Sequence, residues 1–112
     1  MAYGSGEATL YLALKFFKDY SAKYNVASPD PYAIYGYEAM SLMLDAIKRA
    51  SEKGDLTRQA VVDQIFQTKN GNSVLGTYSI DQNGDTSLTD YGLYKIDTGK
   101  LTFDKVIKAQ TG

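Results

Sequence analysis

The chain has 112 residues, 44% of them hydrophobic and 22% charged, and a net charge of −1 at pH 7. This length and composition suit one ordinary domain, or part of one, with a modest core. The chain has no cysteine and no histidine. That excludes disulfides, thiol nucleophiles, histidine-based triads and the commonest transition-metal ligands. The chain lacks the basic stripe that would indicate a nucleic-acid partner, and it has no apolar run long enough for a membrane span.

The start of the chain has no charged region of the kind that opens a secretory signal peptide. Gly4-Ser5-Gly6 is interpreted here as a short artificial linker.

Apolar residues at helical spacing predict a first helix over Glu7–Tyr24. Its expected core face consists of Leu10, Leu14, Phe17 and Tyr24, joined by Ala13, Phe16 and Tyr20. The segment Thr9–Leu14 also alternates as a strand would, so that alternative stays open for these residues. A connector follows over Asn25–Asp30, where Ser28, Pro29 and Asp30 favour a loop.

A second helix is expected from Pro31 to about Glu52. Asp30 can cap its first turn, and Pro31 suits the first helical position because its missing N–H has no partner there. Gly54 is a plausible residue just beyond the C-terminus. The predicted core stripe repeats at three and four residues and consists of Ala33, Tyr37, Met40, Leu44 and Ile47, widened by Ile34, Met43 and Ala50.

Thr57 is the expected N-cap of a third helix. The core face of this helix is predicted to consist of Val61, Val62, Ile65 and Phe66. The polar segment Lys69–Asn72 then breaks the helical pattern. Three helices followed by short strands predict an α/β or α+β architecture.

Three strands are predicted after this break. They cover Gly76–Ile80, Tyr91–Ile96 and Leu101–Ile107. Tight turns separate them, one over Asp81–Asp85 around an Asn-Gly pair and one over Asp97–Lys100.

The acidic turn Asp81–Asp85 invites comparison with a calcium loop. An EF-hand loop has glycine at its sixth position and glutamate at its twelfth. Here the glycine comes fourth, as Gly84, and the twelfth position is Gly92. The pattern therefore favours a hairpin turn with solvated acids, and no metal site is predicted.

Paired carboxylates could perform acid–base catalysis. The acidic residues considered are spread over several expected elements and lie mostly on polar faces: Asp19, Glu38, Asp45, Asp63 and Asp104. A solvated surface accounts for them better. We therefore expect no catalytic residue, no cofactor and no enzymatic activity, which leaves a binding or structural role.

An ordered set of motifs between Phe16 and Lys108 carries a resemblance to a known family. The motifs are Phe16-Phe17-Lys18-Asp19-Tyr20, Pro29-Asp30-Pro31-Tyr32-Ala33, Gly36-Tyr37-Glu38-Ala39, Leu44-Asp45-Ala46-Ile47, Ser73-Val74-Leu75-Gly76-Thr77-Tyr78-Ser79-Ile80-Asp81, Asn83-Gly84-Asp85, Tyr91-Gly92-Leu93-Tyr94-Lys95 and Gly99-Lys100-Leu101. Together they resemble the C-terminal third of the periplasmic (type I) solute-binding proteins of branched-chain amino acid ABC transporters.

This resemblance implies a fold of two α/β lobes with the ligand held in the cleft between them. The chain is then a single partial domain over residues 1–112: a lobe fragment of about three helices followed by three short strands, with one crossing between lobes near Tyr91. Residues 1–15 depart from the family and are of doubtful native origin. The parent protein would be periplasmic or extracellular and would deliver branched-chain or related amino acids to a membrane permease.

The resemblance also implies one ligand-binding residue, Tyr32, at the start of the second helix. The groups that hold the ligand's ammonium and carboxylate come from earlier segments of family members. A fragment without them is not expected to bind an amino acid tightly. The alternative function is an excised or engineered structural fragment that folds and self-associates without a ligand. We expect a homodimer or a domain-swapped oligomer, paired through strands after Gly76.

Overall fold

The computed structural model describes residues 7–110, with side chains from residue 11 onward except 70–72. The interpretation of Gly4–Gly6 therefore lies outside the described residues. Three helices come first: α1 (Glu7–Tyr24), α2 (Ala33–Glu52) and α3 (Arg58–Phe66). The first helix has the predicted bounds, so the alternative of a strand over its N-terminal part is wrong.

The second helix begins two residues later than predicted. Asp30 accepts a hydrogen bond from the Tyr32 N–H through Oδ1 at 2.8 Å, and its carbonyl accepts one from the Ala33 N–H at 3.0 Å. These bonds close a turn over Pro31 and Tyr32 before the helix starts. Asp30 therefore caps this turn, and Tyr32 occupies the N-cap position without a side-chain cap bond.

Local signals at the other helix ends are confirmed. Gly54 has φ +80°, and its N–H donates to the Ser51 carbonyl at 2.9 Å. The Asp55 N–H donates to the Ala50 carbonyl at 3.1 Å, which completes a Schellman motif. Thr57 caps α3 by accepting a hydrogen bond from a backbone N–H of its first turn.

Four strands follow, in two separate antiparallel pairs. β1 (Lys69–Ser73) pairs with β2 (Gly76–Ser79), and β3 (Asp90–Asp97) pairs with β4 (Lys100–Lys108). The last three correspond to the predicted strands, and the mixed α/β class is confirmed. β1 was not predicted, because its sequence has no apolar alternation and its strand geometry comes from backbone pairing with β2.

The turn between β2 and β3 is the predicted Asn-Gly turn. Asp81 and Asp85 are joined by a backbone hydrogen bond of 2.9 Å, and Gly84 has φ +85°. The Asp81 carboxylate accepts the N–H groups of Asn83 and Asp85. One carboxylate oxygen thus serves the turn, and an antiparallel bridge between Ile80 and Thr86 closes it, although β2 and β3 themselves do not pair.

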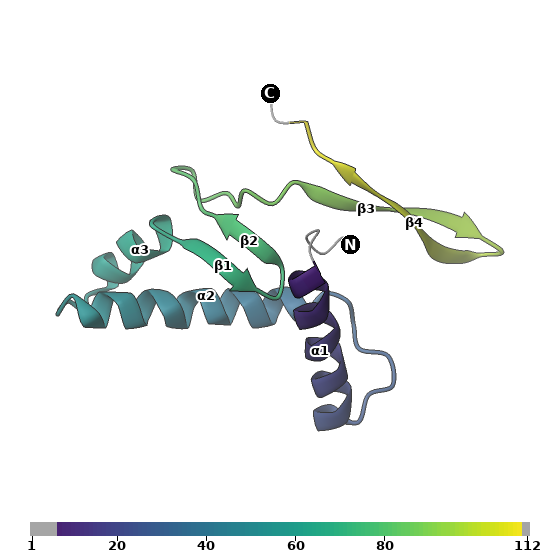
Figure 1. The fold of residues 1–112 in the computed structure, drawn as a ribbon, viewed down its shortest axis with the longest axis horizontal. Coiled ribbons are helices and arrows are strands. Elements are labelled where there is room, and N and C mark those ends of the chain that lie inside the picture. The colour runs from purple at the N-terminus through teal and green to yellow at the C-terminus, as the bar shows by residue number, and fades with distance from the viewer. Residues whose placement is uncertain (1–6, 111–112) are drawn as a thin grey trace.

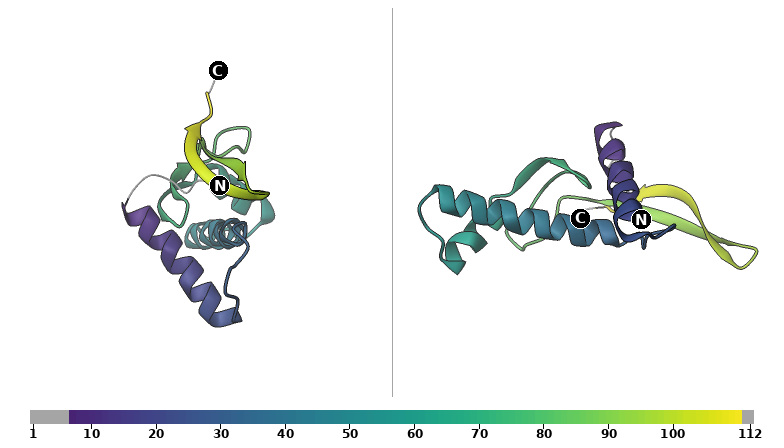
Figure 2. Two further views of the ribbon diagram at one scale, coloured as in Figure 1. Left: turned by 90° about the vertical axis from the view of Figure 1, so that its right-hand side faces the viewer. Right: turned by 90° about the horizontal axis from the view of Figure 1, so that it is seen from below.

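The molecule is extended (Figures 1 and 2). α3 and the β1–β2 hairpin lie on one side of α2, α1 crosses α2 near its start, and the β3–β4 hairpin projects away from the helices. The radius of gyration is 16.4 Å, whereas about 13 Å is expected for a compact domain of this length.

The buried core is small and lies where α1, the start of α2 and the β1–β2 turn meet. Its buried members are Ala13, Ile34, Val74 and Leu75. Ile34 is fully buried, and Phe16 and Phe17 pack partly against the cluster.

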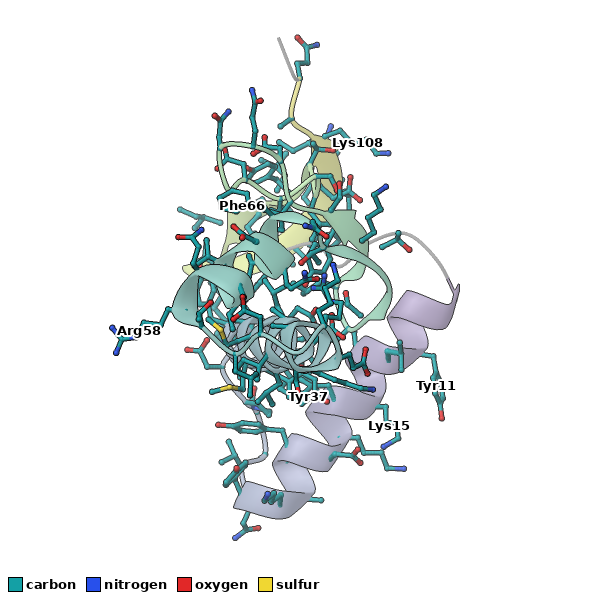
Figure 3. The ribbon with its side chains drawn as sticks, turned by 90° about the vertical axis from the view of Figure 1, so that its left-hand side faces the viewer. Tyr11, Lys15, Tyr37, Arg58, Phe66 and Lys108 are labelled. Carbon is teal, nitrogen blue, oxygen red and sulfur yellow. The ribbon has the colours of Figure 1, made fainter. Side chains whose placement is uncertain are left out.

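The predicted core stripe of α2 is wrong for most of its large residues. Tyr37, Met40, Leu44 and Ile47 are all exposed, Met40 by 60% and Leu44 by 58%. Ile34 and Ala50, which widen the predicted stripe, are buried as predicted, and Glu38 and Ala46 complete the buried side of α2. α3 and the β1–β2 hairpin cover that side, and no described element covers the stripe beyond the crossing with α1 (Figure 3).

The predicted faces of the other two helices are correct only in part. On α1, Ala13 is buried, but Leu14 and Tyr24 are exposed. On α3, Val62 and Phe66 are also exposed. The cause is the same in each case, since these side chains point away from the few elements that pack together.

Candidate functional site

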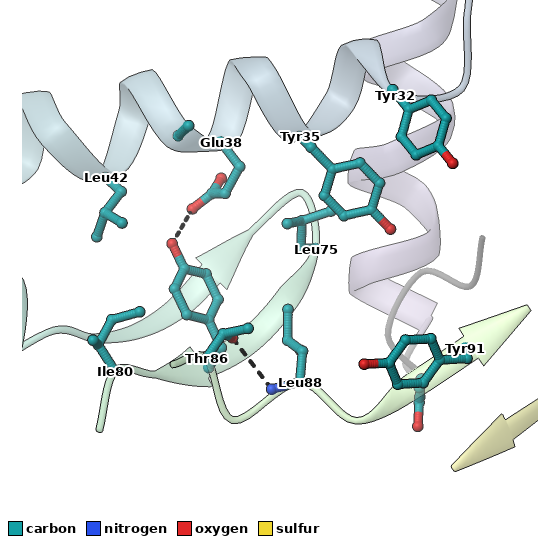
Figure 4. Close-up of a pocket in the computed structure, with 12 residues that line it drawn as sticks. Tyr32, Tyr35, Glu38, Leu42, Leu75, Ile80, Thr86, Leu88 and Tyr91 are labelled. Atoms are coloured by element: carbon teal, nitrogen blue, oxygen red, sulfur yellow. Dashed lines mark hydrogen bonds between the residues drawn. The ribbon is translucent and has the colours of Figure 1, made fainter. Parts of the chain in front are cut away.

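A cavity of about 500 Å³ lies between α2 and the segment that runs from β2 to the start of β3 (Figure 4). We call it the α2–β2 cavity. It is lined by Tyr32, Tyr35, Glu38, Ala39, Leu42, Leu75, Tyr78, Ile80, Thr86, Leu88, Asp90 and Tyr91. Its volume and largely apolar lining are typical of small-molecule sites in proteins.

A buried hydrogen bond between Glu38 and Tyr78 forms one end of the cavity. The Tyr78 hydroxyl donates to Glu38 Oε1 at 2.6 Å, and the two residues are 5% and 4% exposed. The prediction that Glu38 is solvated is therefore wrong. Glu38 lies on the inner side of α2, where a tyrosine 40 residues later in the chain provides its partner.

Aromatic rings form the other end. The ring centroids of Tyr32 and Tyr35 lie 6.3 Å apart, and Figure 4 shows Tyr91 across the cavity from them. Tyr32 is 69% exposed, so it lies at the mouth. Tyr35 lies deeper: burial raises the pKa of its phenol above the ordinary value, with smaller contributions from the phenols of Tyr32 and Tyr94. The sequence-predicted site residue thus stands at the rim of the cavity.

The charged residues that line the cavity are all acidic. Glu38 and Asp90 contribute carboxyl groups, and none of the lining residues is basic. An aliphatic side chain would fit against the leucines, but the carboxylate of an amino acid would find no cation among the lining residues. The lining of the described cavity therefore does not make a complete site for a zwitterion.

A second polar cluster joins α2 to α3 on the same side of α2. Arg49 donates through Nε to Asp45 at 2.9 Å, and through its terminal nitrogens to the Gln64 carbonyl at 2.9 Å and to Thr68 Oγ1 at 3.2 Å. All of its partners belong to the chain itself. This cluster is structural, since it holds one helix against the next.

The described part of the chain offers no group of three or more acidic side chains placed to hold a metal ion. None of its helices combines the length and apolar character needed to cross a bilayer.

The match with known proteins is clearest at the family level. The family model for the periplasmic binding proteins matches residues 5–100. The chain belongs to this family. A comparison with curated proteins finds no match.

Among solved structures, the chain is similar to the crystal structure of the leucine-binding protein LivK from Thermotoga maritima. The two share 32% sequence identity with a TM-score of 0.69, and the match covers 93% of this chain. It covers 27% of the Thermotoga chain, so this chain spans about a quarter of the length of that protein. The expectation of a type I periplasmic binding-protein fold is confirmed, and the chain matches part of that fold.

Sequence reasoning placed Tyr32 near a cavity but missed most of the cavity's lining. Glu38 and Tyr78 gave no signal, because a carboxyl on a helix and a tyrosine on a strand become partners only in three dimensions. Leu42 and Leu88 were likewise unremarkable apolar residues. The assignment of Tyr32 to a ligand site stays a prediction.

Proposed function

We propose that this chain is the C-terminal part of the solute-binding subunit of an ABC importer for branched-chain or related amino acids. In this proposal Tyr32 forms part of the wall of the ligand cleft. The supporting observation is its place, exposed at the mouth of an apolar cavity, in a family whose solved relative is a leucine-binding protein. The parent would work outside the cytoplasm and present its ligand to a membrane permease.

The first test of this function is calorimetry on the chain alone with leucine, isoleucine and valine. Because the cavity lining offers no cation for the ligand's carboxylate, we expect no binding at micromolar concentrations. Micromolar binding would show that the chain holds a complete site and would overturn the proposal that it holds one wall.

The second test is Tyr32→Ala in the full-length parent. Losing the aromatic wall should weaken ligand binding by roughly tenfold. Tyr32→Phe keeps the ring and should bind nearly as well. Tyr24→Ala removes a ring that is 57% exposed at the end of α1 and does not line the cavity, and it is the control. Unchanged affinity for Tyr32→Ala would remove Tyr32 from the site.

A second candidate function is self-association of the chain without a ligand, as a homodimer or a domain-swapped oligomer. The extended shape and the exposed β3–β4 hairpin favour it, because a lone two-stranded hairpin is marginally stable. Pairing of strands after Gly76 between two chains would extend this sheet. Sedimentation that shows monomer alone at micromolar concentrations would contradict it.

A further inference from the structure

The carboxylate of Asp90 lines the α2–β2 cavity without a partner from the chain. Asp90 is half-buried at the first position of β3. Among the described residues, none donates a hydrogen bond to this carboxylate or forms an ion pair with it. Lys108 is its register partner across the β3–β4 pair, but this lysine is exposed and lies beyond ion-pair distance. A carboxylate held partly out of water in this way favours a cation beside it.

Tyrosine rings surround the same end of the cavity. Tyr91 directly follows Asp90 in the chain, and Figure 4 shows its ring across the cavity from Tyr32 and Tyr35. The faces of such rings attract ammonium groups, most strongly where water is partly excluded. None of these three rings has a lysine or arginine over it in the described part of the chain. The rings and the carboxylate together therefore suit a cation that comes from outside the chain.

The cavity is apolar between this end and the buried Glu38–Tyr78 pair. Figure 4 shows Leu75 and Leu88 in this stretch. The volume of about 500 Å³ lies in the range that small molecules occupy in proteins. Because the leucines, the rings and the carboxylate converge on one hollow, the lining specifies a small ligand with an apolar body and one cationic end.

We propose that the α2–β2 cavity binds an apolar primary amine. Its ammonium group lies between Asp90 and the tyrosine rings, and its hydrocarbon body lies against Leu75 and Leu88. An alkylammonium group resembles that of lysine, whose pKa is about 10.4, so it is charged at neutral pH. Unlike an amino acid, an amine has no carboxylate to be left unpaired or to be repelled by Glu38 and Asp90. The inference names a second ligand class for this chain and does not rest on the import function proposed above.

The test compares three small molecules of similar shape by NMR titration of the chain, followed at its tyrosine rings. Isopentylamine is leucine without its carboxylate, isocaproate is leucine without its ammonium group, and isopentyl alcohol is a neutral analogue. Ligands of this size are expected to bind with dissociation constants on the order of millimolar. The amine should bind at least about tenfold more tightly than the acid, with the alcohol between them. It should shift the signals of Tyr32, Tyr35 and Tyr91 but not that of Tyr24, which does not line the cavity.

Replacing Asp90 with asparagine isolates the charge. Asp90→Asn keeps the shape of the side chain, so it should weaken binding of the amine by roughly fivefold to tenfold and leave binding of the alcohol unchanged. Asp97→Asn is the matched control, since Asp97 is the last residue of β3, is exposed and does not line the cavity. This variant should bind all three molecules as the wild type does. The comparison of the three molecules on the wild-type chain needs no variant, so a folding defect in Asp90→Asn does not affect it.

Four results would overturn the proposal. They are equal binding of the three molecules, tighter binding of the acid, absence of amine binding at tens of millimolar, and a folded Asp90→Asn variant that binds the amine as tightly as the wild type. Failure of the import function is measured differently, as unchanged leucine affinity of the full-length parent after Tyr32→Ala. Neither result determines the other.

Discussion

Replacing Tyr78 with phenylalanine tests whether a buried hydrogen bond holds β2 against α2. The substitution keeps the ring, which is 5% exposed, and removes the hydroxyl that donates to Glu38 at 2.6 Å. It therefore isolates one polar contact without opening a large cavity.

The expected loss follows from the burial of both groups. Leaving a buried polar group without a partner costs about 1–3 kcal/mol. Glu38 also has a further interaction in the structure, so we expect the lower part of this range, about 1–2 kcal/mol. For a domain of about 100 residues this lowers the melting temperature by roughly 4–16 °C.

The assay is urea denaturation followed by circular dichroism, at one fixed protein concentration because self-association would add to stability. Tyr24→Phe removes a hydroxyl from an exposed ring and should stay within about 0.5 kcal/mol of wild type. A double-mutant cycle with Glu38→Gln should show a coupling of about 0.5 kcal/mol or more. Additive effects, or a Tyr78→Phe variant as stable as Tyr24→Phe, would refute the reasoning.

Three further predictions concern stability. Ile34→Ala, at a fully buried position, should cost about 2–5 kcal/mol in urea denaturation, whereas Ile96→Ala, on the exposed hairpin, should change stability by less than about 0.5 kcal/mol; equal effects would contradict the assigned core. Arg49→Lys keeps the charge but loses the planar set of donors that joins α2 to α3, so it should cost about 1–2 kcal/mol, and Arg58→Lys, on an exposed residue, should be neutral. The pKa of Tyr35 is raised in the folded state, so its contribution to the free energy of unfolding should be fully present below the unfolded pKa near 10 and be lost as pH rises beyond it. In Tyr35→Phe the free energy of unfolding should fall less steeply between about pH 9 and pH 11, and a fall identical to that of the wild type would exclude this contribution.

The features that sequence predicted correctly are those decided within a few residues. Thr57 caps α3 because its hydroxyl reaches the next turn, and Gly54 ends α2 because a left-handed residue is needed there. The Asn-Gly turn follows the same local chemistry. Helix identity, turn position and three of the four strands could therefore be predicted from the chain.

Features decided by distant partners could not be predicted. β1 is polar and becomes a strand only because β2 returns beside it. Glu38 was assigned to the solvent because nothing near it in sequence announces Tyr78. Most of the lining of the α2–β2 cavity was missed for this reason, and Tyr32 was found through family resemblance and not through spacing.

The error over α2 has a different physical origin. Periodicity correctly identified a helix with apolar residues along one side. It does not show which other element, if any, covers that side. In this structure the covered side of α2 carries Ile34, a carboxyl and two alanines, while Tyr37, Met40, Leu44 and Ile47 remain exposed. A helix that leaves most of its large apolar side chains exposed has more apolar surface than α3 and the β1–β2 hairpin cover. The same conclusion follows from the radius of gyration of 16.4 Å and from the 27% coverage of the leucine-binding protein. Under the proposed function, the rest of the binding protein would cover this face in the parent.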